Sequence, residues 1–158
     1  MLKRVKRPTS ATRRQGGTFA IVASRYNARY VDTMLRAAQK CLRRAGVAHV
    51  FVVRVPGAYE IPVVVARLAR AHTPPLSAII CLGVILRGAT THAQHIGEAV
   101  TDALTRIQIE REIPVIHEVL LLENHQQARE RCLSRDHNRG TEAAHTALEM
   151  ARVMRTLA

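Results

Sequence analysis

The sequence has few aromatic residues, no tryptophan and no long apolar run. Aromatic residues make up 3% of the 158 positions, so a hydrophobic core must be aliphatic, and the hydrophobic fraction of 47% is enough to build one. No apolar segment approaches the roughly 20 residues that a membrane-spanning helix needs. The N-terminus is basic and lacks the apolar stretch of a secretory signal. We therefore expect one cytoplasmic domain.

Cysteines are scarce, and no two of them are close in sequence. Cys41, Cys81 and Cys132 all lie in apolar or helical contexts. An odd number without close pairs is typical of reduced thiols in the cytosol, and it excludes a dense disulfide framework.

Acidic residues are half as frequent as basic ones, 12 against 24, which gives a net charge of +12. Six basic residues and no acid fall within the first 14 positions, so subtracting six leaves +6 for the remainder. We expect residues 1–17 to form a basic flexible arm and residues 18–158 to form a single domain. Because the aromatic side chains that stack on RNA bases are few, nucleic-acid contact should be limited to nonspecific binding by this arm.

Apolar runs alternate with segments of helical periodicity through the rest of the chain. Buried strands are predicted at 19–23, 47–55, 78–86 and 114–122. Helices are predicted through 31–42, over 61–71, from Thr90 or Thr91 to about 112, over 126–132 after a cap at Asn124, and after Gly140. Strands that alternate with helices indicate an α/β fold, a sandwich whose mainly parallel four-stranded sheet is covered on both faces.

Ligands of such sheets bind beyond the carboxyl ends of the strands, and three turns occupy those ends. The turns are 24–27, 56–60 and 87–92. The third contains Gly88, which can adopt backbone angles closed to other residues and can let a ligand approach the main chain. Thr90 or Thr91 can cap the following helix, whose N-terminal N–H groups favour phosphate, and His92 can transfer protons near neutral pH.

Simpler interpretations exist for several of these residues. Tyr26 can be a packing residue at the end of a strand, and Glu60 can be a first-turn carboxylate that favours the helix dipole. His92 and His95 are three residues apart, but no cysteine or carboxylate set with zinc-ligand spacing accompanies them, so no metal site is predicted.

The three turns resemble, in this order, those of the lumazine synthase family of riboflavin biosynthesis. The stretches that carry the resemblance are Ile21–Asn27, Val55–Pro62, Leu82–His92, Pro114–Ile116, Asn138–Gly140 and Ala147–Ala151. The most specific among them are Pro-Gly-Ala-Tyr-Glu-Ile-Pro and Arg-Gly-Ala-Thr-Thr-His. The resemblance extends from about residue 18 to the C-terminus.

The resemblance implies a transferase with a flavodoxin-like three-layer sandwich fold. Such an enzyme condenses 5-amino-6-(D-ribitylamino)uracil with 3,4-dihydroxy-2-butanone 4-phosphate to 6,7-dimethyl-8-ribityllumazine, and it uses no metal and no organic cofactor. It also implies a pentamer, in some members an icosahedral capsid, with active sites between neighbouring subunits and riboflavin synthase as an expected partner.

The resemblance also assigns roles by position. His92 would be the catalytic proton carrier. The phosphate would be bound by Gly88, Ala89, Thr90 and, from a neighbouring subunit, Arg131. The other substrate-binding residues implied are Tyr26, Asn27, Gly57, Ala58, Tyr59, Glu60, Val84, Ile85, Leu86, His117, Arg139 and Glu142. Among these, Tyr26 would stack on the uracil ring, Glu60 would bind the ribityl hydroxyls, and the main chain of 84–86 would pair with the pyrimidine edge. We expect His117, Arg131 and Arg139 to come from the end of the fourth strand and the stretch after it.

Two departures from the family pattern leave alternatives open. The usual Phe-Gly-Val-Leu-Thr after Pro-Val-Ile is His117-Glu118-Val119-Leu120-Leu121 here, and Arg139 replaces the usual lysine. An arginine keeps the charge but cannot easily act as a base. A related riboflavin synthase of the archaeal type and a noncatalytic flavin- or lumazine-binding shell protein are therefore alternatives.

Overall fold

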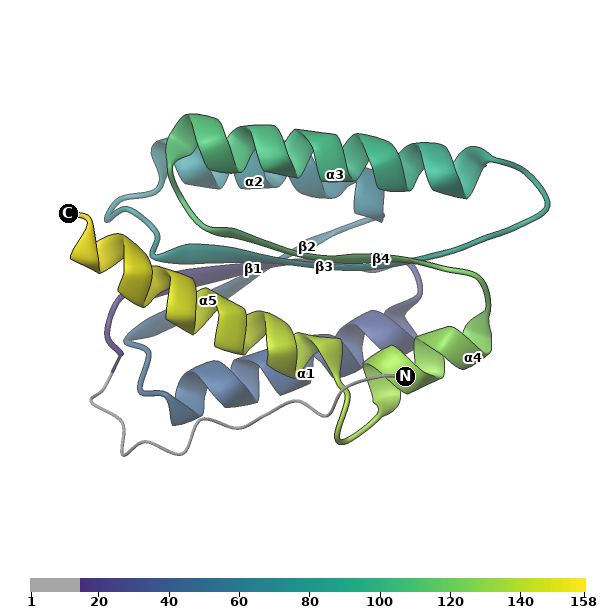
Figure 1. Ribbon diagram of the computed structural model, residues 1–158, viewed down its shortest axis with the longest axis horizontal. Coiled ribbons are helices and arrows are strands. Elements are labelled where there is room, and N and C mark those ends of the chain that lie inside the picture. The colour runs from purple at the N-terminus through teal and green to yellow at the C-terminus, as the bar shows by residue number, and fades with distance from the viewer. Residues whose placement is uncertain (1–14) are drawn as a thin grey trace.

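Four parallel strands form the centre of the molecule in the computed structural model, which describes residues 15–158 (Figure 1). The strands are β1 (Thr18–Ser24), β2 (His49–Val55), β3 (Ala78–Leu86) and β4 (Val115–Leu122), in the order β2-β1-β3-β4. Every residue of β1 is buried, as are the first eight of β3. Sheet positions covered on both faces explain why these two strands are unbroken apolar runs.

Helices cover both faces of the sheet, which confirms the predicted sandwich. On one face lie α1 (Ala28–Arg44), α5 (Arg139–Thr156), the short α4 (His125–Ala128) and a single π-helical turn, η2 (Arg129–Leu133). On the other face lie α2 (Ile61–Ala71), which follows the 3-10 turn η1 (Ala58–Glu60), and α3 (His92–Arg111). Figure 1 shows α2 and α3 above the sheet and α1, α4 and α5 below it.

The helix predicted over 61–71 forms with the expected bounds although it contains three consecutive valines. Valine has a low intrinsic helix propensity. Ile61 and Val65 are fully buried against the sheet, and Pro62 lies in the first turn, where the missing N–H costs little. Tertiary packing therefore outweighs the local preference.

Two predicted elements differ in detail from the observed ones. Asn124 caps a helix as expected, since its side chain accepts a hydrogen bond from Gln127 N at 2.9 Å, but that helix changes to π geometry at Arg129. Gly140 does not precede the last helix. Asn138 is the N-cap, so Gly140 lies inside the first turn of α5.

The predicted arm lies largely outside the described residues, since residues 1–14 are not described. Gln15 and Gly16 bond to the end of α1, with Gln15 N donating to Ala45 O at 3.0 Å and Gly16 N to Gly46 O at 3.4 Å. Across residues 15–158, no helix combines the length and the apolar character that crossing a membrane would require.

Candidate functional site

The strand order places a topological switch point at the carboxyl ends of β1 and β3, which is where open α/β sheets have their ligand crevice. From β1 the chain passes to β2 through α1 on one face of the sheet, and from β3 it passes to β4 through α3 on the other face. The connections therefore diverge between β1 and β3, and ligands of doubly wound sheets bind outside such a switch point. The turns predicted from the sequence to hold the site surround this crevice.

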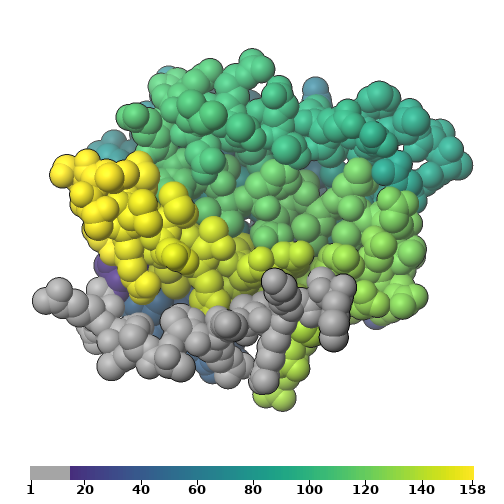
Figure 2. Space-filling view, in the orientation of Figure 1, coloured from purple at the N-terminus to yellow at the C-terminus, as the bar shows by residue number. Residues whose placement is uncertain are grey.

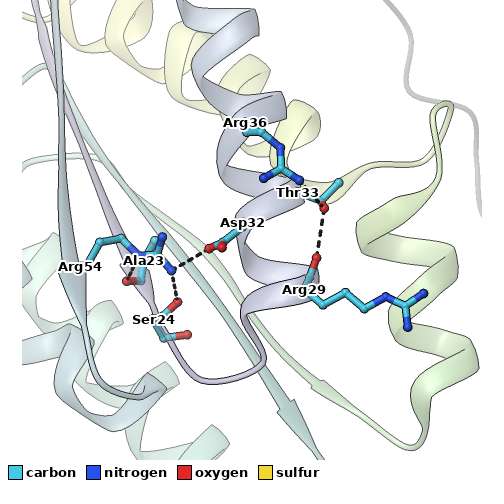
Figure 3. A network of polar contacts seen from close by, with 7 residues as sticks. All are labelled: Ala23, Ser24, Arg29, Asp32, Thr33, Arg36 and Arg54. Atoms are coloured by element: carbon cyan, nitrogen blue, oxygen red, sulfur yellow. Dashed lines mark hydrogen bonds and ion pairs between the residues drawn. The ribbon is translucent and has the colours of Figure 1, made fainter.

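The turns after β1 and β2 are fastened to each other by main-chain bonds. Arg25 N donates to Val55 O at 2.8 Å, and Tyr26 N donates to Pro56 O at 3.0 Å. Arg54 of β2 reinforces the same junction, because its guanidinium donates to Ala23 O, to Ser24 O at 3.0 Å and to the Asp32 carboxylate at 2.7 Å (Figure 3). The end of β1 is thus held against α1 and β2.

Asn27 connects the first turn to β3. It has a left-handed backbone, with φ of 57°, and its Nδ2 donates to Val84 O at 2.7 Å. β1 pairs with β3 only as far as Leu82, so the last residues of β3 extend beyond β1. Their main chain therefore faces the crevice, where a planar ring can pair with it.

Exposed aromatic side chains flank this crevice. Tyr26 is 74% exposed and Tyr59 is 64% exposed, so the interpretation of Tyr26 as a packing residue within the chain is wrong. The simpler interpretation of Glu60 has support, because Glu60 Oε2 accepts a hydrogen bond from Gly57 N at 2.9 Å and closes the 3-10 turn η1. Ala58 is buried beneath that turn.

The turn after β3 presents an exposed helix N-terminus. Gly88 does not have a positive φ, and a Cβ placed there would meet nothing within 4 Å, so the expectation of special backbone angles is wrong and the main chain is open. Thr91 occupies the N-cap position of α3, yet its hydroxyl pairs with His95 Nε2 at 3.3 Å. Thr90 Oγ1 instead accepts from His92 N, at 3.4 Å.

This third turn is tied to the end of β4. Arg87 N donates to Leu122 O at 2.8 Å, and the Arg87 guanidinium contacts Glu123 at 3.1 Å. His92, the predicted proton carrier, is the first residue of α3 and is exposed. The turns predicted at the carboxyl ends of β1, β2 and β3 therefore do meet along one edge.

The second group of predicted site residues lies on and after β4. His117 is the third residue of β4, opposite Cys81, and not near the strand's end as expected. Its Nδ1 accepts a hydrogen bond from Val119 N at 3.1 Å, so its Nε2 carries the proton that Thr101 Oγ1 accepts at 2.8 Å. Burial also lowers the pKa of His117, which keeps the ring neutral near pH 7.

Arg131 lies in η2 and Arg139 begins α5. The Arg131 guanidinium donates to Gln127 O at 3.4 Å and approaches Glu130 at 3.8 Å. Arg139 pairs with Glu142 at 2.8 Å, while its buried Nε has no partner. Arg139 and Glu142 were both predicted from the sequence to bind substrate, and they bind each other in this structure.

A titratable group missed by the sequence analysis lies beside this pair. Burial raises the pKa of the Glu118 carboxyl to about 7, Arg139 partly opposes that rise, and Glu142 adds to it. Arg54, which positions the first turn, was also missed. In the sequence, Arg54 and Glu118 each stand out as a charged residue within an apolar strand, and this pattern could have marked both as residues with a specific role.

We expect Glu118→Gln to flatten the dependence of stability on pH. The folded-state pKa lies above the ordinary value of 4.5, so the folded protein binds the proton more tightly than the unfolded chain. Stability is therefore lost as pH rises from about 4.5 through 7, by about 1–2 kcal/mol once the partial exposure of Glu118 to solvent is taken into account.

Urea unfolding at pH 5 and pH 8 measures this loss. Between pH 5 and pH 8, the Glu118→Gln variant should lose less stability than the wild type, by about 1–2 kcal/mol. Glu149→Gln, which replaces an exposed carboxylate on α5, serves as the control and should behave like the wild type. Equal pH dependence in the wild type and Glu118→Gln would show that the Glu118 carboxyl is not desolvated in the folded protein.

The two groups of predicted site residues are not brought together within one chain. β2, which precedes Glu60, and β4 are separated by three strand spacings, about 14 Å. His117 lies five residues before Leu122, about 16 Å from the carboxyl end of β4. No hydrogen bond or ion pair among residues 15–158 joins His117, Arg131 or Arg139 to the crevice residues of the first group. β4 is an edge strand, and Figure 2 shows its green surface between α3 and α5.

Comparison with known proteins gives one consistent result. The family model described as 6,7-dimethyl-8-ribityllumazine synthase matches residues 16–155. The enzyme of that name from Stenotrophomonas maltophilia strain R551-3 is 40% identical over 145 residues, which cover 90% of this chain and 92% of the relative. That from Thermobifida fusca is 40% identical over 153 residues, 96% and 88% of the two chains. The enzyme from Halorhodospira halophila is 39% identical over 145 residues, which cover 90% of this chain and 92% of the relative.

Proposed function

The chain belongs to the 6,7-dimethyl-8-ribityllumazine synthase family, and on this premise we propose that two copies of it form each active site. The chain is a transferase of riboflavin biosynthesis that condenses 5-amino-6-(D-ribitylamino)uracil with 3,4-dihydroxy-2-butanone 4-phosphate. The relatives favour this reaction over a riboflavin synthase of the archaeal type and over a noncatalytic shell protein.

One copy contributes the crevice at the carboxyl ends of β1, β2 and β3. Tyr26 stacks on the uracil ring, and the main chain of 84–86, which β1 leaves unpaired, pairs with the pyrimidine edge. Glu60, beside Ala58 and Tyr59, accepts hydrogen bonds from the ribityl hydroxyls. The exposure of Tyr26 and the end of β1–β3 pairing at Leu82, which leaves the main chain of 84–86 unpaired on the β1 side, support these assignments.

The phosphate of the second substrate binds at the turn from β3 to α3. Gly88, Ala89 and Thr90 surround an open space in which a Cβ at residue 88 would meet no atom, and the N-terminus of α3 adds unpaired N–H groups and the positive end of its dipole. A cationic side chain beside the phosphate would stabilise it as the leaving group. Arg131 of the second copy supplies that charge.

His92 serves the successive proton transfers. The amine attacks the ketone and water is lost to form an imine. A proton is then removed beside the imine and phosphate leaves, after which ring closure releases a second water. A histidine with a pKa near neutral can donate and accept protons in turn, and holding two reactants in register supplies much of the remaining acceleration.

The separation of the two residue groups is the observation that carries the shared site. His117 lies about 16 Å from the carboxyl end of β4, and within residues 15–158 no hydrogen bond or ion pair joins His117, Arg131 or Arg139 to the crevice residues, so we take these side chains to serve the crevice of another copy. A neighbouring copy placed against the β4 edge resolves this separation. We propose a pentameric ring of this kind, with His117, Arg131, Arg139 and Glu142 facing the neighbour's crevice.

Larger assembly and location are part of the same proposal. The short connection from Cys132 to Gly140 is compatible with the closure of pentamers into a shell that holds a riboflavin synthase partner. Cys41, Cys81 and Cys132 are free thiols, and burial raises the pKa of each. Unreactive free thiols suit a reducing compartment, so we place the enzyme in the cytoplasm.

Complementation between two weakened variants tests the shared site. His92→Ala should lower kcat roughly 100-fold, since a general acid–base group is lost while binding remains. Co-assembled with Arg131→Ala, it should regain about a quarter of wild-type activity, because one interface in four of a randomly mixed ring carries both native residues. The formation of lumazine is followed by its fluorescence.

The matched control is a mixture of His92→Ala with Glu60→Ala. Both residues belong to the same half of the site, so no interface can carry both native side chains and no activity should return. If mixed rings of His92→Ala and Arg131→Ala show only the average of the parents, each subunit works alone.

A further inference from the structure

His117 is held at the edge of the sheet by α3 and by its own strand. β4 is an edge strand, so no further strand of the described chain covers its outer side. The half-buried ring lies on the α3 side of the sheet, because Val115 and Val119, which share its face of β4, belong to the core beneath α2 and α3. His117 is thus the polar member of an otherwise apolar row.

The polar contacts of the His117 ring form a chain of hydrogen bonds with one direction. Val119 N donates to Nδ1 at 3.1 Å, so Nδ1 carries no proton and the ring is neutral with its proton on Nε2. Nε2 donates to Thr101 Oγ1 at 2.8 Å, and the Thr101 hydroxyl donates in turn to Gly97 O at 2.8 Å. A second proton on Nδ1 would point at the Val119 N–H, and burial also lowers the pKa of His117, so both effects favour the neutral ring.

These bonds limit what His117 can offer to a ligand. A free imidazole can donate, accept and carry a charge near neutral pH. Here both ring nitrogens are bonded within the chain, so only the uncharged faces of the ring remain for a ligand. The family pattern has a phenylalanine at this position, and a neutral histidine with both nitrogens satisfied is chemically close to it.

We propose that Thr101 is a positioning residue that holds His117 as a neutral aromatic surface for the planar ring of the uracil substrate. This role rests on the shared site proposed above, in which His117 faces the crevice of a neighbouring copy. Stacking requires a flat ring held in a fixed orientation and no hydrogen bond to the substrate. A phosphate gains little from an uncharged ring, so the effect should be confined to the uracil substrate.

Helix α3 supplies a matched control for Thr101. Thr105 lies one turn further along the helix and is also exposed, and its hydroxyl donates to Thr101 O at 2.8 Å, just as the Thr101 hydroxyl donates to Gly97 O. Thr101 differs because its hydroxyl also accepts from His117. Valine at either position removes the hydroxyl at nearly constant shape, so a difference between the two variants reports on the bond to the ring.

Steady-state lumazine formation by the full-length protein tests the proposal. His117→Ala should raise the KM for the uracil substrate about tenfold and Thr101→Val about fourfold, while kcat and the KM for the phosphorylated substrate stay within about twofold of wild type. His117→Phe, Thr101→Ser and Thr105→Val should change each KM by about twofold at most, since they keep the ring, the hydroxyl and the bond to His117, respectively. In a His117→Phe background, Thr101→Val should have no further effect, because a phenyl ring has no nitrogen to bond.

The kinetic outcomes separate this role of Thr101 from the proposed site. If His117→Ala raises the KM for the uracil but Thr101→Val does not, or does so equally in the His117→Phe background, the positioning role is wrong while His117 keeps its place in the site. If His117→Ala changes neither KM, the ring does not meet the substrate, and both the positioning role and the placement of His117 are wrong. Complementation of His92→Ala with Arg131→Ala decides the shared site in either case.

Urea unfolding of the same variants tests the bond without any activity measurement. Thr101→Val should lower the unfolding midpoint more in the wild-type background than in the His117→Phe background, because only the histidine loses a partner. Thr105→Val should lower it equally in both backgrounds. Equal effects of Thr101→Val in the two backgrounds would overturn the proposal, since they would show that Thr101 and His117 are not coupled in the folded protein.

Discussion

Replacing Gly140 with alanine should destabilise the protein by about 3 kcal/mol or more. A Cβ at residue 140 would overlap the main chain of Met34 in α1, lying 2.6 Å from its carbonyl carbon and closer still to its oxygen. Met34 is fully buried, so α1 and α5 would have to move apart. For a domain of this size, the loss corresponds to a fall in Tm of roughly 6–12 °C.

The same change in another helix provides the control. Gly97 lies inside α3, where a Cβ would meet Leu121 at an ordinary 3.5 Å, so Gly97→Ala should raise stability by about 0.5–1 kcal/mol. Urea unfolding followed by circular dichroism, at one fixed protein concentration, measures both variants. A Gly140→Ala protein as stable as the wild type would show that the two helices do not touch at this point.

This close approach also matters for the site. Asn138 caps α5 by accepting from Gly140 N at 2.8 Å, and its Nδ2 donates to Cys132 O at 2.7 Å. The two bonds join the end of η2 to the start of α5, so they set the relative positions of Arg131 and Arg139. The glycine that lets α5 approach α1 therefore also places two residues proposed to bind substrate.

The sandwich fold could be predicted from the sequence because the patterns that mark its strands and helices are local. β3 has the predicted bounds, and its apolar run ends at Arg87-Gly88. A strand covered on both faces is apolar throughout, so its first and last residues are easy to recognise in the sequence. Helix α2 was predicted despite its valines because its turn signals, Pro56-Gly57 and Pro62, are local as well. Alternation of strands and helices then implied a parallel sheet.

The sequence could not supply features that depend on contacts between distant residues. The requirement for Gly140 comes from Met34, which lies on a different helix. His117 was expected near the end of its strand, but the register that pairs it with Cys81 places it well below the carboxyl edge. Arg54 acts on three groups of β1 and α1, none of them adjacent to it in sequence.

Replacing Arg131 with alanine should raise the KM for 3,4-dihydroxy-2-butanone 4-phosphate about 100-fold, with much less effect on the KM for the uracil substrate. A guanidinium offers five donors, whereas the polar contacts of Arg131 within residues 15–158 are a 3.4 Å bond to Gln127 O and a 3.8 Å approach to Glu130. Most of its hydrogen-bonding capacity is therefore free for a phosphate. The loss of a charge-assisted bidentate contact costs about 2.7 kcal/mol, which corresponds to this factor.

Steady-state kinetics with each substrate varied in turn separate a phosphate role from a structural one. Arg129→Ala, an exposed arginine at the start of the same π-helical turn, is the control and should leave both KM values within about twofold. Arg131→Lys should restore part of the affinity, because it keeps the charge and loses the bidentate geometry. Equal rises in both KM values, or no recovery with lysine, would mean that Arg131 orders the segment around η2 and does not hold the phosphate.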